Sequence, residues 1–337
     1  MAVTPVPPPT GSPDEGVAWH YGDPLREQRD LARGAALVDL SHRGVVTVSG
    51  PDRLPWLHDL TTAKVDELAP GESRLALILD PHGRVEHELH LVDDGATTWI
   101  TVEAGAAPTL VTYLRSMQFL RDVVVTDESD RWAVVGSIGA DDPLPGERVA
   151  WSVPAEFAGT GVTPAGTDRG GGAERYVPRR PATFAAREHV VPRDAGVPEG
   201  GRAGTWAWEA LRVAAAVPRI GMETDARSLP HELGWIGSGV HLAKGCYRGQ
   251  ETVARTHNMG RPPRRLVLLH LDGSADHLPD PGAEVTSADG VVVGRLTSVA
   301  QHFELGPIAL AVVKHRVPTD APLLVAGVAA AQEPVVV

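Results

Sequence analysis

The strongest constraint on the fold is a change of pattern at Pro262-Pro263. Downstream of this dipeptide the chain contains short apolar runs, such as RRLVLLHL and GPIALAVVK, separated by turns rich in Gly or Pro. Short strands with tight turns of this kind are typical of a small closed barrel. We therefore place a domain boundary there and predict a C-terminal β-barrel domain over residues 262–337.

The region before this boundary mixes helix and strand patterns. Residues 26–33, 107–120 and 205–217 have helical character, whereas residues 73–105 alternate as a β-meander. We predict an α+β region over residues 26–261, made of two subdomains whose boundary falls near 126–205. No element is predicted for residues 141–204, which are rich in Gly, Pro and charge, and residues 1–25 are predicted to form a disordered, proline-rich tail.

Charge and composition exclude several classes of function. The net charge of −12 argues against broad binding to nucleic acid or to membranes, and the chain has no apolar run long enough to span a bilayer. The N-terminus lacks the basic and apolar segments of a signal peptide, and a single cysteine cannot build a disulfide framework. We therefore expect a cytoplasmic protein.

The single cysteine lies in the octapeptide KGCYRGQE, residues 244–251. Lys244 precedes Cys246 by two positions and Arg248 follows it by two, and neighbouring cations favour the reactive thiolate. The alternative is a small buried apolar side chain, which is the commoner role of a free cysteine. Between residues 244 and 265, six cations face one acid, so this stretch is either a site for an anionic ligand or a solvated basic surface.

Motifs for metal or nucleotide chemistry are absent from the sequence. HELH at 87–90 lacks the spacing of the helical zinc motif H-E-x-x-H, and there is no C-x-x-C, so no metal bound by side chains is expected. The chain also lacks a G-x-x-x-x-G-K-[ST] phosphate loop and the G-x-S-x-G turn of hydrolases. Glu209 and Arg212 lie three positions apart on the helix at 205–217. They either form a salt bridge or present Glu209 to the N–H and amino groups of a heterocycle.

The octapeptide resembles the signature K-G-C-[FY]-x-G-Q-E of YgfZ-type folate-binding proteins, which are relatives of the glycine-cleavage T-protein, an aminomethyltransferase. Further stretches are similar to the same group. They are LVDLSHRGVVTVSGPDRLPWLHDLTTAKVDELAPG, the hairpin LILDPHGRVEHELHLV, the segment EALRVAAAVPRIGMETDARSLPHELGW and the C-terminal GPIALAVVK. Together the matches extend over roughly residues 26–330, and they are weakest at 141–204.

This resemblance implies an α+β fold arranged as a T-protein-like ring, in which folate-binding domains and a C-terminal small β-barrel surround a central folate site. It implies tetrahydrofolate or a derivative as the cofactor. It also implies a role in the assembly or repair of iron–sulfur proteins, including tRNA-modifying enzymes. The implied partners are folate and iron–sulfur client or assembly proteins, with no direct nucleic acid and no membrane expected.

The resemblance also suggests roles for individual residues. Cys246 is predicted to be the reactive thiol, with Lys244 beside it as the second candidate catalytic residue. Glu209, held by Arg212, is predicted to bind the pterin edge. The remaining cofactor-binding candidates are the other signature residues, Tyr247, Arg248, Gly249, Gln250 and Glu251. The arginines from Arg255 to Arg265 are predicted to meet the polyglutamate tail of the folate.

One departure from the T-protein pattern bears on activity. Where the T-protein has an Asp-Asp pair in its hairpin, this chain has His87 and Glu88. The carboxylate that would hold the reacting amine is therefore either lost or moved to a longer side chain. We favour a folate-binding accessory factor. The alternatives are a folate-dependent aminomethyltransferase or other one-carbon transferase, and an interaction scaffold with a vestigial folate pocket.

Overall fold

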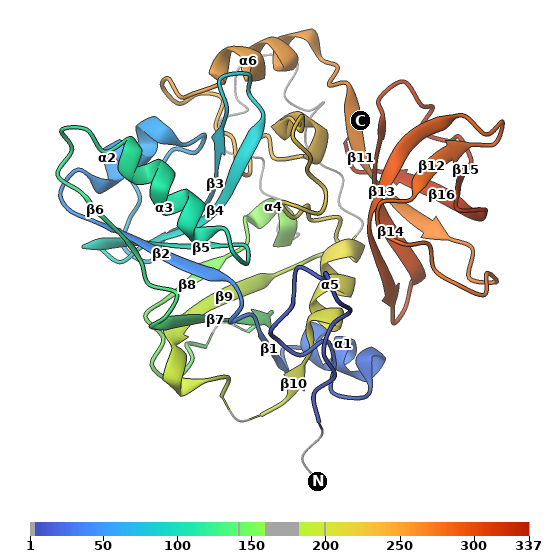
Figure 1. The fold of residues 1–337 in the computed structure, drawn as a ribbon, viewed down its shortest axis with the longest axis horizontal. Coiled ribbons are helices and arrows are strands. Elements are labelled where there is room, and N and C mark those ends of the chain that lie inside the picture. Colours follow the sequence, from blue (N-terminus) through green and yellow to red (C-terminus); the bar gives the residue numbers. More distant parts are fainter. Residues whose placement is uncertain (1–3, 141, 159–181, 199, 337) are drawn as a thin grey trace.

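The computed structural model describes residues 4–140, 142–158, 182–198 and 200–336. These residues form two five-stranded sheets and a closed six-stranded barrel, and the three units are arranged around a common centre (Figure 1). The predicted α+β fold with a C-terminal β-barrel is confirmed. Within the described ranges, no helix is both long enough and apolar enough to cross a membrane.

The first sheet, with strand order β3-β4-β5-β2-β6, comes from the continuous stretch 44–127. Successive side chains along each strand point to opposite faces of the sheet, so the two faces pack into two different hydrophobic cores. Ala76 and Ile78 of β3 pack under two helices on one face, whereas Leu75 and Leu77 face the centre of the molecule. The elements are β2 (Gly44–Ser49), α2 (Arg53–Leu60), β3 (Ser73–Leu79), β4 (Val85–Asp93), β5 (Thr97–Val102), α3 (Ala107–Ser116) and β6 (Val124–Asp127).

The second sheet, with order β10-β1-β7-β9-β8, is assembled from distant parts of the chain. Its early strand β1 pairs in parallel with β10 and antiparallel with β7. Three of its strands, β8, β9 and β10, lie in the stretch for which no element was predicted. The elements are α1 (Pro24–Ala32), β1 (Leu37–Asp39), β7 (Trp132–Ile138), β8 (Val149–Ser152), α4 (Ala155–Ala158), β9 (Ala186–Pro192), η2 (Arg193–Ala195), β10 (Arg202–Ala203) and α5 (Thr205–Ala214).

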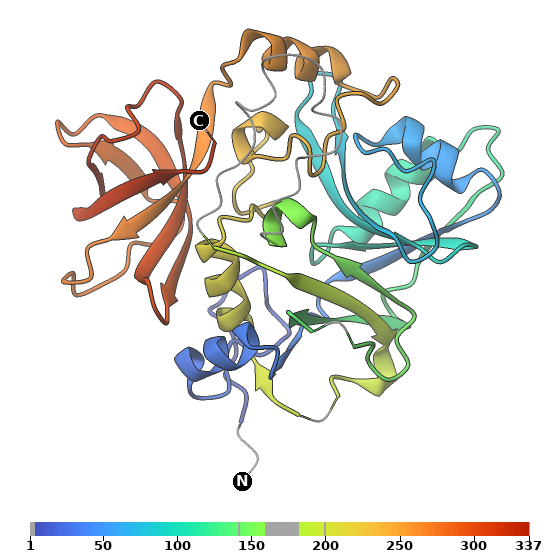
Figure 2. The same cartoon turned by 180° about the vertical axis from the view of Figure 1, so that it is seen from behind.

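The barrel begins directly after Pro262-Pro263 and closes through the pairing of its first and last strands. Val267 and Leu269 fill its interior, while Leu266 and Leu268 of the same strand join the central core shared with both sheets. Helix α5 packs against the barrel strands β13 and β14, as Figure 2 shows from behind. The barrel strands are β11 (Arg264–Leu271), β12 (Glu284–Ser287), β13 (Val292–His302), β14 (Gly306–Lys314), β15 (Leu323–Val325) and β16 (Val328–Pro334).

The N-terminal segment differs from the predicted disordered tail, because residues 4–23 pack against the domains. Asp14 is 2% exposed and accepts a hydrogen bond from Arg219 at 2.8 Å. The backbone carbonyls of Ala18 and Trp19 accept hydrogen bonds from Thr205 and Trp206 at the start of α5. The proline content suggested a segment unable to form a core of its own. The segment is instead held by a buried ion pair and by the unpaired N–H groups that begin a helix.

Candidate functional site

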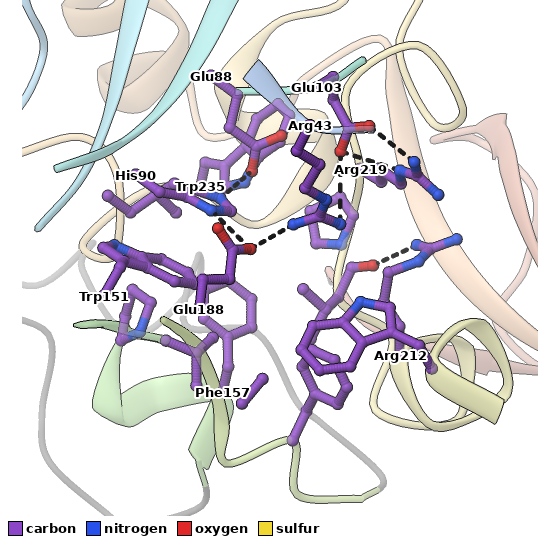
Figure 3. Close-up of a pocket in the computed structure, with 18 residues that line it drawn as sticks. Arg43, Glu88, His90, Glu103, Trp151, Phe157, Glu188, Arg212, Arg219 and Trp235 are labelled. Atoms are coloured by element: carbon purple, nitrogen blue, oxygen red, sulfur yellow. Dashed lines mark hydrogen bonds and ion pairs between the residues drawn. The ribbon is translucent and has the colours of Figure 1, made fainter. Parts of the chain in front are cut away.

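A cavity lies between the two sheets and the start of the segment that follows α5 (Figure 3). The open space inside it is about 40 Å³, and about 470 Å³ when the gaps between its lining atoms and the solvent at its mouth are counted. Aromatic rings form much of its wall, and charged side chains from several elements complete it. The aromatic lining residues are Trp151, Phe157, Phe184, Trp208 and Trp235, and the charged ones are Arg43, Glu88, His90, Glu103, Glu188, Arg212 and Arg219.

Strand β4 places Glu88 and His90 on the cavity face, because positions two apart on a strand share a face. His87 points the other way and lies 6.0 Å from the ring of Tyr113 on α3. Glu88 accepts a hydrogen bond from the backbone N–H of Ile220 at 3.1 Å. Of the two possibilities raised by the missing Asp-Asp pair, the structure shows the second. A carboxylate is retained at the cavity, on a longer side chain.

His90 is held between two carboxylates and an indole ring. Its Nδ1 lies 3.0 Å from Glu188, its Nε2 lies 3.7 Å from Glu88, and its ring stacks on Trp151 at 3.7 Å between centroids. Burial opposes the charged imidazolium, but Glu188 and Glu88 outweigh it and raise the pKa of His90 to about 9. The cavity therefore contains a cationic His90 at neutral pH.

Glu188 is the anionic centre of this wall. It accepts hydrogen bonds from Arg43, from His90 and from the hydroxyl of Thr101. Burial alone would raise the pKa of Glu188, but His90 and Arg43 hold it well below its usual range. Both oxygens of Glu188 are engaged within the protein, which leaves Glu88 with more capacity to bind a ligand.

Arg212 and Arg219 carry a second buried network between α5 and the cavity. Arg212 donates to Glu209 at 2.8 Å and to Glu223 at 3.0 Å, so the predicted contact between Glu209 and Arg212 forms. Arg219 donates to Glu209 at 3.1 Å and to Glu103 at 2.7 Å. Arg212 lines the cavity but Glu209 does not. Glu209 is thus bound by two arginines, and its contact with a pterin edge stays a prediction.

The signature loop lies outside the cavity, since none of residues 244–251 is among the described residues that line it. Lys244 is buried, and its ammonium donates to the backbone carbonyls of His58 and Thr61 at the end of α2. It also lies 5.2 Å from the ring centroid of Tyr247, which is itself buried. Burial lowers the pKa of Lys244 to about 8, while Asp59, Asp66 and Cys246 act in the opposite direction. Cys246 is exposed.

The rest of the signature fixes the loop to the hairpin between β3 and β4. Arg248 pairs with Glu86 at 3.2 Å. Gly249 has φ +82, and a Cβ there would lie 2.6 Å from the carbonyl oxygen of Asp80, so only glycine fits. Gln250 begins helix α6 (Gln250–Met259), and Glu251 is exposed. Arg248 and Gly249 therefore hold the loop against the hairpin turn, and the binding of residues 247–251 to the cofactor stays a prediction.

Three large apolar side chains are exposed just after helix α3. Arg248 stands 5.9 Å from the ring of Tyr113 on α3, and α3 ends four residues before Leu120. Met117, Phe119 and Leu120 follow the helix and are 41%, 92% and 87% exposed. Phe119 also has a left-handed backbone, with φ 43, which is uncommon for a residue other than glycine. Large apolar side chains exposed together are typical of contact surfaces.

The basic stretch is less open than its sequence suggested. Arg264 forms ion pairs with Asp225 at 2.6 Å and with Glu232 at 2.8 Å. Arg265 is buried and donates to the carbonyl of His315 at 2.9 Å. The internal pairing of these two arginines removes them from the predicted contact with a polyglutamate tail. Arg255 and Arg261 remain exposed.

Most residues of the cavity were not among the predicted site residues. HELH at 87–90 was considered as a metal motif, although its alternation already placed Glu88 and His90 on one face of a strand. Trp151 and Glu188 lie in the stretch 141–204, where no pattern was found. In the described parts of the chain, no group of three or more His, Cys, Asp or Glu side chains is placed to hold a metal ion.

Two α+β units and a barrel around a central cavity define a T-protein-type architecture. A crystal structure of the glycine cleavage system aminomethyltransferase T from Bartonella henselae has the same fold, with a TM-score of 0.71 over 93% of this chain and 89% of that one, at 17% identity. Residues 18–141 match the family described as the GCVT N-terminal domain.

Sequence relatives agree with this architecture. A probable aminomethyltransferase of Natronomonas pharaonis is 31% identical over 301 residues, which cover 84% of this chain and 80% of the relative. The chain therefore belongs to the aminomethyltransferase family of the glycine-cleavage T-protein. A more distant relative from Mycosarcoma maydis, named as a mitochondrial homolog of the iron–sulfur cluster assembly factor IBA57, is 26% identical over 82% of this chain and 66% of its own length.

Proposed function

We propose that this protein binds tetrahydrofolate, or a derivative of it, in the central cavity and acts as an accessory factor in the assembly or repair of iron–sulfur proteins. The observation that carries the folate part is the cavity itself. Its aromatic walls suit a flat heterocycle, and Glu88 supplies an acceptor for N–H and amino groups. Ligand sites in proteins are commonly apolar cavities with a few placed polar groups, as here.

This proposal moves the ligand contacts away from the signature loop. Glu88, His90 and Trp151 hold the heterocycle, whereas Lys244 and residues 247–251 hold the loop that carries Cys246. The buried charges around Glu188 and Arg43 keep the cavity walls in place and exclude water from them. When bound, tetrahydrofolate would supply a one-carbon or redox-active centre beside Glu88.

Anaerobic calorimetry with tetrahydrofolate tests the folate part. We expect wild type to bind with micromolar affinity, about −8 kcal/mol. Trp151→Leu removes the ring that stacks on His90 and should weaken binding about tenfold, which is ~1.4 kcal/mol. Trp132→Leu, which removes a ring packed on Trp99 away from the cavity lining, is the control and should bind like wild type. Equal affinity for all three proteins would place the ligand elsewhere.

The accessory role is supported by the position of Cys246. An exposed thiol outside the cavity is accessible to a second protein. The exposed apolar residues Met117, Phe119 and Leu120 offer a contact surface, and they follow the helix whose Tyr113 lies 5.9 Å from Arg248 of the loop. The relative named as an iron–sulfur cluster assembly factor homolog is consistent with such a partner. Clients that modify tRNA are included in this proposal on the resemblance of the signature alone.

Complementation of a strain that lacks the protein tests the accessory role. The readout is the activity of an iron–sulfur enzyme such as aconitase, measured against its protein level. Wild type should restore the activity, whereas Cys246→Ser and the double variant Phe119→Ser/Leu120→Ser should not. Leu278→Ser/Leu305→Ser, which changes two exposed apolar residues of the barrel, is the matched control and should complement. Full complementation by Cys246→Ser would remove the thiol from the proposal.

A second candidate function, folate-dependent one-carbon transfer, is favoured by one observation. Glu88 keeps a carboxylate at the cavity in the place of the T-protein Asp-Asp pair. Transfer of the methylene carbon from an aminomethyl-lipoyl intermediate to tetrahydrofolate, with release of ammonia and the dihydrolipoyl group, can be assayed directly with purified protein. Turnover by wild type that Glu88→Gln abolishes would make the protein an enzyme. Tetrahydrofolate binding without turnover would leave the accessory role.

A further inference from the structure

His90 and Glu88 leave one ionic contact open on the wall of the central cavity. His90 Nε2 lies 3.7 Å from Glu88 Oε1, beyond the length of a good hydrogen bond, and Figure 3 shows the two side chains pointing toward each other. Neither atom forms a hydrogen bond with a described residue, and neither belongs to the fully buried atoms that lack a partner. Both atoms therefore keep accessible surface, and the side chains are 17% and 9% exposed.

The surrounding structure holds this contact open. Glu188 fixes His90 through Nδ1 at 3.0 Å, and Trp151 covers one face of the imidazole ring. The other oxygen of Glu88 accepts the backbone N–H of Ile220 at 3.1 Å. Each side chain is thus fixed from behind. The free donor and the free acceptor are preorganised, so they lose little freedom when a ligand group enters beside them.

The two free atoms have complementary chemical roles. The neighbouring carboxylates keep His90 cationic at neutral pH, so its Nε2–H is a charged donor. Glu88 Oε1 is an acceptor that can take a proton from water. The open space of the cavity that both residues line is about 40 Å³, more than the roughly 10–15 Å³ that one water molecule needs. A base that activates water and a cation that stabilises an oxyanion are the groups that hydrolysis of an amide-type bond requires.

We propose that the protein hydrolyses an N-formyl derivative of tetrahydrofolate to formate and tetrahydrofolate, with Glu88 as general base and His90 as donor to the oxyanion. This inference rests on the proposed folate binding and adds an activity to it. The formyl class follows from charge, because a formyl oxygen gains negative charge during the reaction and the cation stabilises it. A methenyl group is itself cationic, and a methylene group carries no oxygen, so neither would use the donor.

The reaction needs no oxidant and no reactant other than water. Glu88 takes a proton from water as the oxygen–carbon bond forms at the formyl carbon, and the electron pair of the C=O bond moves onto the oxygen that accepts from His90. The C–N bond then breaks as Glu88 returns the proton to the nitrogen. The products are tetrahydrofolate and formate, which is released with one proton.

Formate release from 10-formyltetrahydrofolate by the purified protein, measured anaerobically at saturating substrate, tests this activity. We expect Glu88→Gln and His90→Gln each to lower kcat by about a hundredfold or more. His87→Gln is the matched control, because His87 is next to Glu88 but points to the other face of β4. It should keep the wild-type kcat.

The dependence of kcat on pH separates a proton-donating role of His90 from a structural one. In the described part of the chain, the charged groups in contact with His90 are Glu88 of the same strand and Glu188 of β9, and Arg43 reaches it through Glu188. The pKa of His90 is about 9, so the wild-type rate should fall as the pH rises through 9 and the cation is lost. His90→Gln should lack this alkaline limb.

Binding of an inert analogue gives a readout that needs no turnover. An analogue with carbon in place of N10 keeps the carbonyl group but cannot be hydrolysed. By calorimetry, wild type and His87→Gln should bind it at least about tenfold more tightly than the same compound without the carbonyl. His90→Gln should reduce this preference to about twofold or less.

The outcomes distinguish this activity from folate binding itself. Tetrahydrofolate binding without formate release would overturn the hydrolysis and leave the folate site in place. Absence of both binding and release would overturn both proposals. A wild-type rate or analogue preference in His90→Gln would contradict the role of His90. Should His90→Gln not fold, a flat wild-type profile between about pH 7 and 10, or an unchanged kcat in Glu88→Gln, would contradict the proposal instead.

Discussion

The central cavity and the signature loop use similar charged residues in opposite ways. At the cavity, Arg212 and Arg219 have side chains that are 3% exposed, and each contacts more than one carboxylate. At the loop, Cys246 and Arg248 are exposed, and the buried Lys244 donates to backbone carbonyls. The comparison teaches that the most recognisable motif of the chain lies outside its central cavity. The signature loop builds a surface, and the cavity is built by residues from several separate stretches of the chain.

The largest expected effect is on the stability of the cavity network. Arg212→Met leaves Glu209 and Glu223 without a main partner in a buried site, so it should lower the free energy of unfolding by about 3–5 kcal/mol. Arg26→Met removes an exposed ion pair with Asp30 and should change the free energy of unfolding by less than about 1 kcal/mol. Urea unfolding measures both. Similar losses of unfolding free energy in the two variants would show that the buried ion pairs of Arg212 do not stabilise the fold more than an exposed pair does.

The next effect is a pH dependence that belongs to the cavity. The pKa of His90 is raised to about 9, so its contribution is complete below the unfolded value of roughly 6.5 and is lost as the pH rises through 9. The stability difference between wild type and His90→Gln should be about 3 kcal/mol near pH 6 and should shrink between about pH 6.5 and pH 9. Urea unfolding at several pH values measures this difference. A difference that grows with pH would contradict the pairing of His90 with Glu188 and Glu88.

A smaller effect is expected at the loop. Lys244→Met leaves the carbonyls of His58 and Thr61 without their donor, which should cost about 1–3 kcal/mol of stability. Arg248→Met removes a half-exposed pair with Glu86 and should cost less than about 1 kcal/mol. Thermal unfolding of the two variants, side by side, shows whether Lys244 is the anchor of the loop. Equal stability would mean that the loop is held in another way.

The smallest expected effect is on the reactivity of Cys246, and it tests whether the signature loop and the cavity are separate sites. Because Cys246 is exposed and lies outside the cavity lining, saturating tetrahydrofolate should leave its rate of alkylation by iodoacetamide within about twofold. Strong protection by the ligand would place Cys246 at the folate and join the two regions into one site. The measurement uses mass spectrometry, and the single cysteine makes the product unambiguous.

Local patterns predicted the elements well where the periodicity was long. The meander at 73–105 became β3, β4 and β5, and the helix at 205–217 became α5 (Thr205–Ala214). The second sheet was beyond such reasoning. Its strand β1 has three residues, and it pairs with β10, which lies some 160 positions further along the chain. Short strands paired over that distance carry no local signal.

The contacts of the candidate site also divide into those that local spacing predicts and those that it does not. The contact between Glu209 and Arg212 follows from helical spacing and forms as predicted, at 2.8 Å. The contact between His90 and Glu188 joins positions 98 apart, on strands of different sheets, and no spacing rule predicts it. The signature loop was found because its residues are adjacent in sequence. These adjacent residues form one loop that packs on the β3–β4 hairpin, where Gly249 lies against Asp80.

The separation of cavity and thiol is the central claim, and anaerobic calorimetry of tetrahydrofolate with wild type and with Cys246→Ala tests it most directly. The prediction is micromolar binding by both proteins, with dissociation constants within about twofold of each other. A loss of about tenfold or more in Cys246→Ala would show that the thiol belongs to the ligand site. No binding by wild type would contradict the folate-binding account as a whole.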